Sequence, residues 1–217
     1  MSDVRDRVGS LFRSRFLRGY VRGKIGGDPV YEAASKHLPD APLLDLGCGV
    51  GVLAFYLRER GFTAPIVAID HDVKKIERAR QAGRAYDALT FRSGDARQPL
   101  EFAGSVALLD LLHYFDEATQ RQILRNVAAA VAPGCVAIIR DGIRDGSWRY
   151  RMTYAQESFS RLIGWLRAER LHFPTMPTIL DAFIPFELVA CHRLSGRTPF
   201  NNYLFVFRRP SEGITKE

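Results

Sequence analysis

Short apolar runs alternate with amphipathic stretches through most of the chain. Such runs are typical of strands buried in a parallel sheet, and the stretches between them repeat apolar residues at helical spacing. The runs predict strands at residues 43–46, 65–70, 89–92, 106–110, 135–140, 186–192 and 202–207. The spaced stretches predict helices at about 30–38, 51–60, 73–83, 117–131 and 148–170, and a short helix that ends near 183. This alternation predicts an α/β fold, a Rossmann-like doubly wound sheet with helices on both faces.

The N-terminal segment has a different pattern. Residues 3–22 place apolar side chains at i, i+4, i+7, i+8 and i+12, which predicts one amphipathic helix with arginines on its other faces. The stretch 23–29, rich in glycine, predicts a hinge. This helix either packs on the domain or a dimer mate, or offers a basic surface to an acidic partner or to membrane headgroups. We divide the chain into a basic helical segment that serves as a lid (1–40), a domain (41–209) and a polar tail (210–217).

The charge is concentrated at one end of the chain. Residues 1–24 contain seven Lys and Arg against two Asp, a net charge of +5, whereas the whole chain of 217 residues carries +7. A hydrophobic content of 47% is that of a globular protein, and no apolar run or secretory signal predicts membrane insertion or export. Three cysteines without a C-x-x-C pair argue against a zinc site or a disulfide framework. We therefore expect a cytoplasmic protein without a metal.

The segment Asp45-Leu-Gly47-Cys48-Gly49-Val-Gly51 joins a predicted strand to a predicted helix. Glycines adopt positive φ and let a ligand lie directly against the backbone, while the following helix directs its N–H groups at the same place. The dinucleotide fingerprint is G-x-G-x-x-G, whereas the glycines here occupy every second position after an acidic residue. The added carboxylate favours a nucleotide-like ligand with a cationic part over a diphosphate.

This segment resembles motif I of the class I S-adenosylmethionine-dependent methyltransferases. The resemblance implies S-adenosylmethionine as the cofactor and S-adenosylhomocysteine as the product. It also implies a seven-stranded sheet, mostly parallel, whose last strand is antiparallel. In that family the loop over Gly47, Cys48, Gly49 and Gly51 wraps the methionine part of the cofactor, and Asp45 serves its ammonium group. Cys48 fits this loop as a small filler rather than a nucleophile.

An acidic residue ends the next predicted strand. Asp70 lies 19 positions beyond Gly51, where a carboxylate can accept hydrogen bonds from both hydroxyls of a ribose. The resemblance gives Asp70 this role and places His71 beside it. Asp72 is expected instead to cap the helix that follows.

A third acidic residue follows the third predicted strand. In the methyltransferases the loop at this position closes on the adenine ring, so the resemblance implies that Asp95 accepts from the exocyclic amine and that Ala96 lies beside the ring. A plain Gly-Asp turn is the alternative. Asp45, Asp70 and Asp95 follow three successive strands, at the edge where doubly wound sheets bind ligands.

The string Asp110-Leu-Leu-His113-Tyr114-Phe follows the fourth predicted strand and resembles a string common in small-molecule methyltransferases. The resemblance places both Asp110 and His113 near the transferred methyl group, and it implies that Asp110 also contacts the cofactor. His113 is the candidate general base, because an imidazole titrates near neutral pH. The alternative is a structural histidine at the helix entry, and His71 and His172 are weaker candidates for the base.

Aromatic and arginine side chains are candidates for binding the acceptor, and together they favour a planar or apolar acid. Arg140 can bind an acidic group, or it can pair with Asp141 or Asp145. A faint similarity to methyltransferases of aryl-polyene and polyketide-like pathways implies an acceptor carried by an acidic acyl carrier protein, which would dock on the basic helix. The candidates are Tyr20, Tyr31, Tyr114, Arg140, Trp148 and Arg151.

Two other functions stay open. An RNA or protein substrate would suit the basic charge, but the chain lacks the Asn/Asp-Pro-Pro-Tyr/Phe string of amino methylases, and its basic segment lacks interleaved aromatics for stacking bases. A non-catalytic protein with a cofactor fold would act only as a scaffold. The sequence does not decide the oligomeric state.

Overall fold

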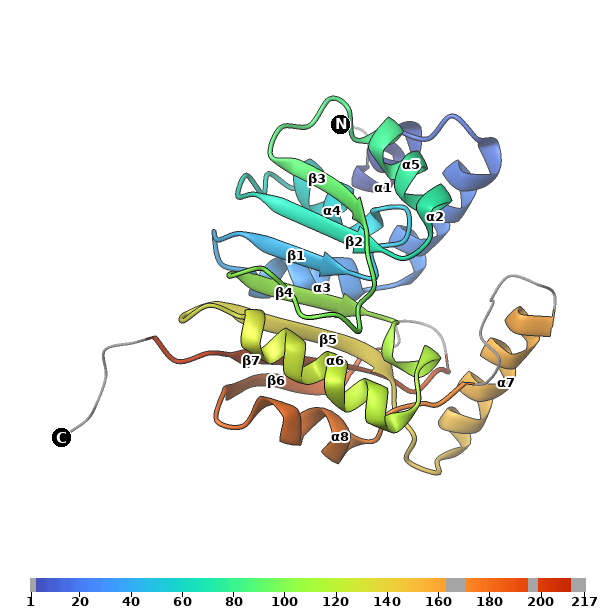
Figure 1. The fold of residues 1–217 in the computed structure, drawn as a ribbon. Helices are drawn as coiled ribbons and strands as arrows, with labels where there is room; N and C mark the ends of the chain where they lie inside the picture. The colour runs from blue at the N-terminus through green and yellow to red at the C-terminus, as the bar shows by residue number, and fades with distance from the viewer. Residues whose placement is uncertain (1–2, 163–170, 195–198, 212–217) are drawn as a thin grey trace.

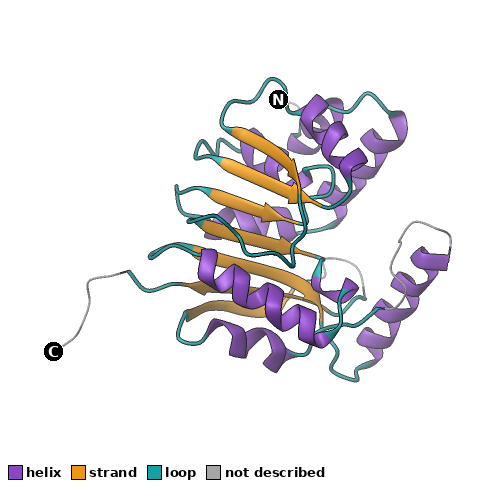
Figure 2. Cartoon of the chain, viewed as in Figure 1, coloured by secondary structure: helices purple, strands orange, loops and turns teal. Residues whose placement is uncertain are grey.

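A computed structural model describes residues 3–162, 171–194 and 199–211. In this part of the chain seven strands form one sheet with the order β3-β2-β1-β4-β5-β7-β6, and helices cover both of its faces (Figures 1 and 2). The end of the helix predicted at 148–170 and most of the predicted tail, 210–217, lie outside the described residues.

The strands lie within two residues of their predicted bounds. They are β1 (Leu43–Leu46), β2 (Ile66–Asp70), β3 (Leu89–Ser93), β4 (Ser105–Leu109), β5 (Val136–Gly142), β6 (Glu187–Arg193) and β7 (Asn202–Arg208). The first five run parallel, and β7 pairs antiparallel with both β5 and β6, which confirms the predicted topology. The strand order reverses between β1 and β4, so a crevice opens at the carboxyl ends of these strands.

The helices pack in two layers. The α-helices are α1 (Val4–Ser10), α2 (Arg15–Gly27), α3 (Val30–His37), α4 (Val52–Glu59), α5 (Val73–Ala82), α6 (Glu117–Ala130), α7 (Trp148–Leu162) and α8 (Met176–Leu180). Two 3₁₀ turns, η1 (Leu112–Tyr114) and η2 (Asp181–Phe183), complete the described elements. One buried apolar cluster packs the five helices from α1 through α5 against one face of the sheet. A second cluster packs α6 and α8 against the opposite face.

The N-terminal segment differs from the prediction of one helix over 3–22 followed by a hinge. The chain breaks at residues 11–14, because Phe12 turns into the core against the ring of Phe55 and Ser14 caps α2 by accepting from the Leu17 N–H. The apolar stripe therefore ends there, and Phe16 is 61% exposed. The predicted hinge is also wrong, since α2 continues through the glycines to Gly27.

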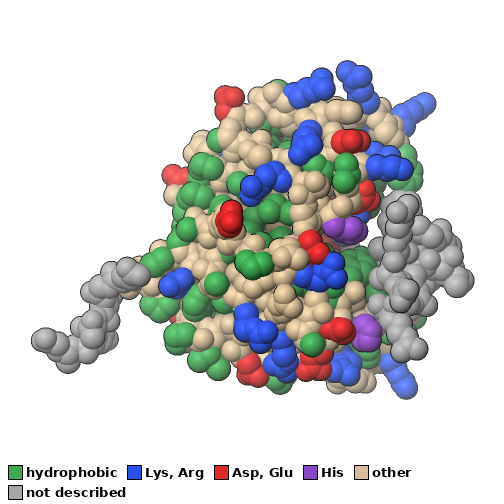
Figure 3. Space-filling model, in the orientation of Figure 1, with side chains coloured by type: hydrophobic (Ala, Val, Ile, Leu, Met, Phe, Trp, Pro, Cys, Tyr) green, Lys and Arg blue, Asp and Glu red, His purple; other side chains and the backbone are tan. Residues whose placement is uncertain are grey.

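A salt bridge fixes this segment to the domain. Arg7 of α1 donates to a carboxylate oxygen of Glu59 at 2.5 Å and to its carbonyl oxygen at 3.0 Å, and the Tyr86 hydroxyl donates to the same carboxylate. The helix α1 is therefore tied to the end of α4, the helix that begins at the glycine loop. Figure 3 shows Lys and Arg side chains gathered over the end of the molecule that α1, α2 and α5 form.

Candidate active site

Two cavities lie at the carboxyl edge of the sheet. The β1–β3 cavity, about 690 Å³, lies over the ends of β1, β2 and β3. The β4–β5 cavity, about 470 Å³, lies between α2, the ends of β4 and β5, and α7. The turn after β4 borders both: Leu111 and Tyr114 line the first, while Asp110 and His113 line the second. Both volumes are in the range of small-molecule sites.

The glycine loop lies between β1 and α4, and its first glycine, Gly47, lines the β1–β3 cavity. Gly47, Gly49 and Gly51 have φ values of 83°, 58° and 83°, a conformation that side chains disfavour. A Cβ on Gly51 would lie 2.6 Å from the Phe91 ring, so packing also requires glycine there. A Cβ on Gly49 would meet nothing within 4 Å, so the loop is open at that residue. Cys48 is buried, and burial raises the pKa of its thiol, which fits a filler better than a nucleophile.

Asp70 lies at the edge of the β1–β3 cavity and holds the loop in place. One carboxylate oxygen accepts from the Gly49 N–H at 2.8 Å, and the other accepts from the Asp72 N–H at 2.9 Å. A carboxylate has about four lone-pair sites, so two stay available to a ligand. Asp72 caps α5 as predicted, accepting from Lys74 and Lys75.

Asp45 is 3% exposed, and its Oδ2 has no hydrogen-bond partner among the described residues. Burial, and then the charge of Asp70, raise the pKa of Asp45 to about 7. An unpaired buried carboxylate is costly unless a cation or donor reaches it. This orphaned oxygen fits a ligand with an ammonium group.

Asp95, Ala96 and His71 also line the β1–β3 cavity. Asp95 is held by the Arg97 guanidinium at 2.6 Å, and this hydrogen bond is the main reason why the pKa of Asp95 is lowered. Exposed pairs of this kind are weak, so a ligand can compete for the carboxylate. The imidazole of His71 is mostly exposed, with Nδ1 3.5 Å from Asp70.

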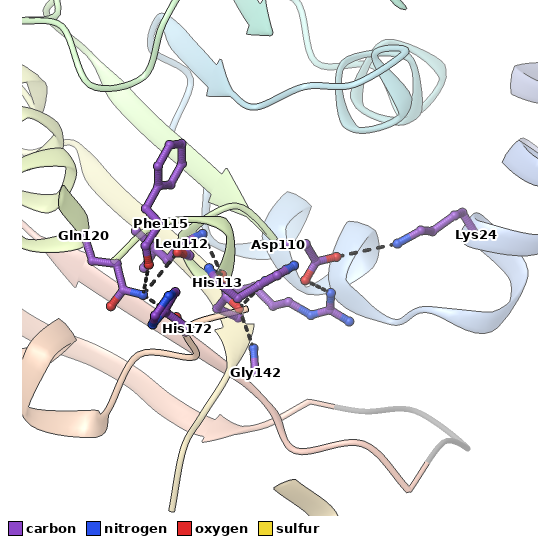
Figure 4. Close-up of polar contacts among 10 residues, drawn as sticks. Lys24, Asp110, Leu112, His113, Phe115, Gln120, Gly142 and His172 are labelled. Atoms are coloured by element: carbon purple, nitrogen blue, oxygen red, sulfur yellow. Dashed lines mark hydrogen bonds and ion pairs between the residues drawn. The ribbon is translucent and has the colours of Figure 1, made fainter. Parts of the chain in front are cut away.

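Charged side chains form a network at the β4–β5 cavity (Figure 4). Arg140 binds the carboxylates of Asp110 and Asp28, the latter at 2.8 Å, and the Lys24 ammonium lies 3.5 Å from Asp110. Burial raises the pKa of Asp110, but Arg140 and Lys24 outweigh burial and lower it to about 2. Asp110 also has a φ of 56°, which is uncommon for a residue other than glycine. Arg140 therefore pairs with Asp110 and Asp28 rather than with Asp141 or Asp145.

Asp141 fixes the turn that carries His113. Its Oδ2 accepts from the backbone N–H of Leu112 at 2.8 Å, and its Oδ1 lies 2.7 Å from Nδ1 of the His113 ring. An N–H on Nδ1 bound to a carboxylate leaves Nε2 as the basic nitrogen of a neutral imidazole. His113 and Asp141 are both buried, so the ring has one defined orientation.

The structure brings only part of the predicted acceptor set together. Tyr20 and Arg140 line the β4–β5 cavity, and Tyr114 lines the β1–β3 cavity. Tyr31 is buried against Tyr56 and lines neither cavity. The exposed Trp148 and Arg151 on α7 line neither cavity as well.

Sequence reasoning missed four residues at this site. Lys24 and Asp28 come from a segment predicted as helix and hinge, and Phe173 from a loop, so no motif marked them. Asp141 had a usable signal: it is an acidic residue directly after the predicted strand 135–140, and Asp70 and Asp110 are acidic residues that end their predicted strands.

Comparisons with known proteins agree with this geometry. The model of a methyltransferase domain family matches residues 43–134. The fold is similar to that of a Pyrococcus horikoshii protein, with a TM-score of 0.64 at 21% identity, covering 91% of this chain and 92% of that one. Magnesium protoporphyrin IX methyltransferase from Synechocystis, with bound S-adenosylhomocysteine, matches with a TM-score of 0.64 at 20% identity, over 94% and 91% of the chains. No curated protein matches the sequence.

A third solved structure is an O-methyltransferase family 2 protein from Planctomyces limnophilus in complex with apigenin. It matches with a TM-score of 0.65 at 16% identity, over 93% of this chain and 62% of that one. The fold is that of the class I S-adenosylmethionine-dependent methyltransferases, and residues 43–134 match a methyltransferase domain. Its cofactor is S-adenosylmethionine.

Two further observations concern only the described residues. None of their helices is both long and apolar enough to cross a bilayer. Their His, Cys, Asp and Glu side chains form no group of three that could hold a metal ion.

Proposed function

We propose that this methyltransferase acts on a small-molecule acceptor held in the β4–β5 cavity, with His113 as general base and Asp141 as its positioning residue. One observation carries the proposal: a single turn presents Leu111 and Tyr114 to one cavity and Asp110 and His113 to the other. A methyl group can pass between two ligands only where their sites adjoin.

The β1–β3 cavity fits the cofactor. Asp70 would accept from the ribose hydroxyls, Asp95 from the adenine amine, and the unpaired Oδ2 of Asp45 would face the ammonium end. The open side of Gly49 would let the methionine part lie against the backbone. These assignments are those that the resemblance to the class I methyltransferases implies, and the acceptor oxygens of the three carboxylates support them.

The β4–β5 cavity suits a small acceptor with an aromatic part. Tyr20, Phe173 and Phe200 supply its flat apolar walls, and His113 and Arg140 supply polar groups. An acidic carrier protein could deliver an acceptor that is an acid. Two exposed arginines, Arg13 just before α2 and Arg15 at its first residue, support this form of the proposal.

In this reaction the protein has two tasks: it positions the acceptor oxygen and it accepts one proton. The cofactor supplies an electrophilic methyl group on a sulfonium. His113 would accept the proton of an acceptor hydroxyl at Nε2, so that the oxygen could take the methyl group that the cofactor would supply, with S-adenosylhomocysteine as the leaving product. Asp141 stabilises the imidazolium that forms, and the walls of the cavity hold the oxygen in line.

The test is methyl transfer to a panel of acceptors. We expect S-adenosylhomocysteine to form with phenolic and hydroxylated aromatic acids, and we expect no methylation of total RNA or of a protein extract. Product is measured by mass spectrometry, with S-adenosylmethionine alone as the blank. Methylation confined to RNA or protein would contradict the proposal.

Asp45 gives a prediction about pH. Because its pKa in the folded protein is about 7, raised from 3.8, its neutral form is favoured, and stability is lost as pH rises from about 4 through 7. Three pKa units correspond to about 4 kcal/mol, so we expect Asp45→Asn to melt at least about 5 °C above the wild type at pH 8 without cofactor.

At pH 4 the difference should be much smaller, since Asp45 is then neutral in the folded protein and still partly neutral in the unfolded chain. Thermal unfolding at both pH values measures the difference. A difference that is equal at pH 4 and pH 8 would show that Asp45 is not the titrating group.

A further inference from the structure

One face of α2 consists of glycine. Gly19, Gly23 and Gly27 are four residues apart, so they lie on the same side of the helix. All three are exposed, and all three line the β4–β5 cavity. The helix therefore presents bare backbone to this cavity.

Neither the backbone nor packing within the protein requires these glycines. None of the three has a φ in the left-handed region, and a Cβ on any of them would meet nothing within 4 Å. Glycine in a helix interior lowers stability relative to alanine. In the glycine loop, by contrast, Gly51 is required by its φ and by the Phe91 ring. The remaining reason for glycine at these positions of α2 is that a side chain there would occupy part of the cavity.

A second flat surface lines the same cavity. The ring of Phe173 is stacked on His113, with centroids 5.3 Å apart and planes at 20°, and the Tyr150 ring meets it edge-on. A Cβ on Gly142 would lie 2.7 Å from the Phe173 ring, so glycine there lets the ring lie close to β5. The ring is thus held on several sides.

The charges at this cavity suit an anion. Lys24, Arg140, Asp28 and Asp110 sum to zero, whereas the cofactor brings a single net positive charge beside them. Arg140 is 5% exposed, and its Nε has no hydrogen-bond acceptor among the described residues. An anionic group on the acceptor would balance the charge of the cofactor and supply acceptors to Arg140 and Lys24.

We infer that the acceptor is a flat, conjugated acid, and that the glycine face of α2 selects it by shape. This inference rests on the proposed function, because it takes the β4–β5 cavity as the acceptor site. We expect a flat molecule to lie between the bare helix backbone and the Phe173 ring, and a puckered, thicker one to fit there less well. Gly23, the middle residue of the face, is the main determinant of this selection.

The experiment measures binding by calorimetry to protein saturated with sinefungin, an unreactive analogue whose added ammonium group keeps the single net positive charge of S-adenosylmethionine. The probes are 4-hydroxycinnamate, its puckered analogue 3-(4-hydroxycyclohexyl)propanoate, and the neutral 4-hydroxycinnamamide. We expect 4-hydroxycinnamate to bind at least about tenfold more tightly than either of the others. Gly23→Leu should weaken its binding by about tenfold or more and leave the affinity for sinefungin unchanged.

Gly26→Leu is the matched control, because Gly26 lies on the same helix but faces Arg5 and does not line the cavity. Both variants should melt at or above the wild-type temperature, since leucine favours helix over glycine. Equal binding of the flat and puckered acids, no binding of any probe, or an unchanged affinity in Gly23→Leu would overturn the inference. Tight binding of the flat acid without methyl transfer would support it and refute the role proposed for His113.

Discussion

Asp70→Ala is expected to weaken S-adenosylmethionine binding by about 100-fold or more. The carboxylate already orders the loop through the Gly49 N–H, and two lone-pair sites remain for the two ribose hydroxyls. Each hydrogen bond to a charged group contributes about 1.5–3 kcal/mol, and two such bonds account for this loss. Calorimetric titration of the wild type and the variant measures it directly. NADH should bind to neither protein.

Asp116→Ala is the control for a general loss of stability. Asp116 is also a capping carboxylate, accepting from the Thr119 N–H at 2.8 Å, but it lines neither cavity. It should lower the melting temperature slightly and keep the wild-type affinity. Asp70→Asn, which retains one acceptor oxygen, should bind with intermediate affinity. Wild-type affinity in Asp70→Ala, or an equal loss in Asp116→Ala, would remove Asp70 from the cofactor site.

His113→Gln should lower kcat by a factor of about 10²–10⁴ with the best hydroxylated acceptor, while the affinity for S-adenosylmethionine stays unchanged. The ring lines the β4–β5 cavity rather than the β1–β3 cavity, so its loss removes proton transfer and not cofactor contacts. Single-turnover rates and a binding titration separate the two effects.

Asp141→Asn tests how the base is positioned. A neutral amide stabilises the imidazolium less than a carboxylate does, so the acid limb of the pH–rate profile should move to lower pH as kcat falls. A purely structural role for Asp141 would lower the rate without moving this limb. His192→Gln, an exposed histidine on β6, is the control and should keep the wild-type profile. A normal kcat in His113→Gln would show that no base is needed at this position.

The sheet could be predicted from the sequence because its strands are short apolar runs that fit one environment. The run Leu43–Leu46 is buried along its whole length, as expected for a central strand that pairs in parallel with β2 and β4. The N-terminal segment could not be predicted in the same way. Its apolar spacing suits one helix, but the packing of Phe12 on Phe55 and the cap at Ser14 break it into two. Its role as a separate lid stays a prediction.

The candidate site also has a part that could be predicted from the sequence and a part that could not. The residues of the β1–β3 cavity are local to motifs at strand ends, so Asp70 and the glycine loop could be selected from spacing together with the family resemblance, and Asp95 from the resemblance. The β4–β5 cavity is assembled from segments far apart in the chain, as the pairing of Asp28 with Arg140 illustrates. Tyr31, Trp148 and Arg151 were selected by residue type near that site, and residue type does not report which side chains face a cavity.

The lining residues of the two cavities are distributed differently along the chain. Among the described residues, the β1–β3 cavity is lined by residues from 46 to 115, whereas the β4–β5 cavity takes its lining from α2, β5, α7, β7 and the loop at Phe173 as well as the turn after β4. Under the proposed assignment of the two cavities, most of the acceptor lining lies outside the segment that would hold the cofactor. Such an arrangement would let the acceptor be changed by exchanging peripheral segments, and it marks α1 and α2, joined to the domain through Arg7 and Glu59, as a unit for building chimaeric enzymes.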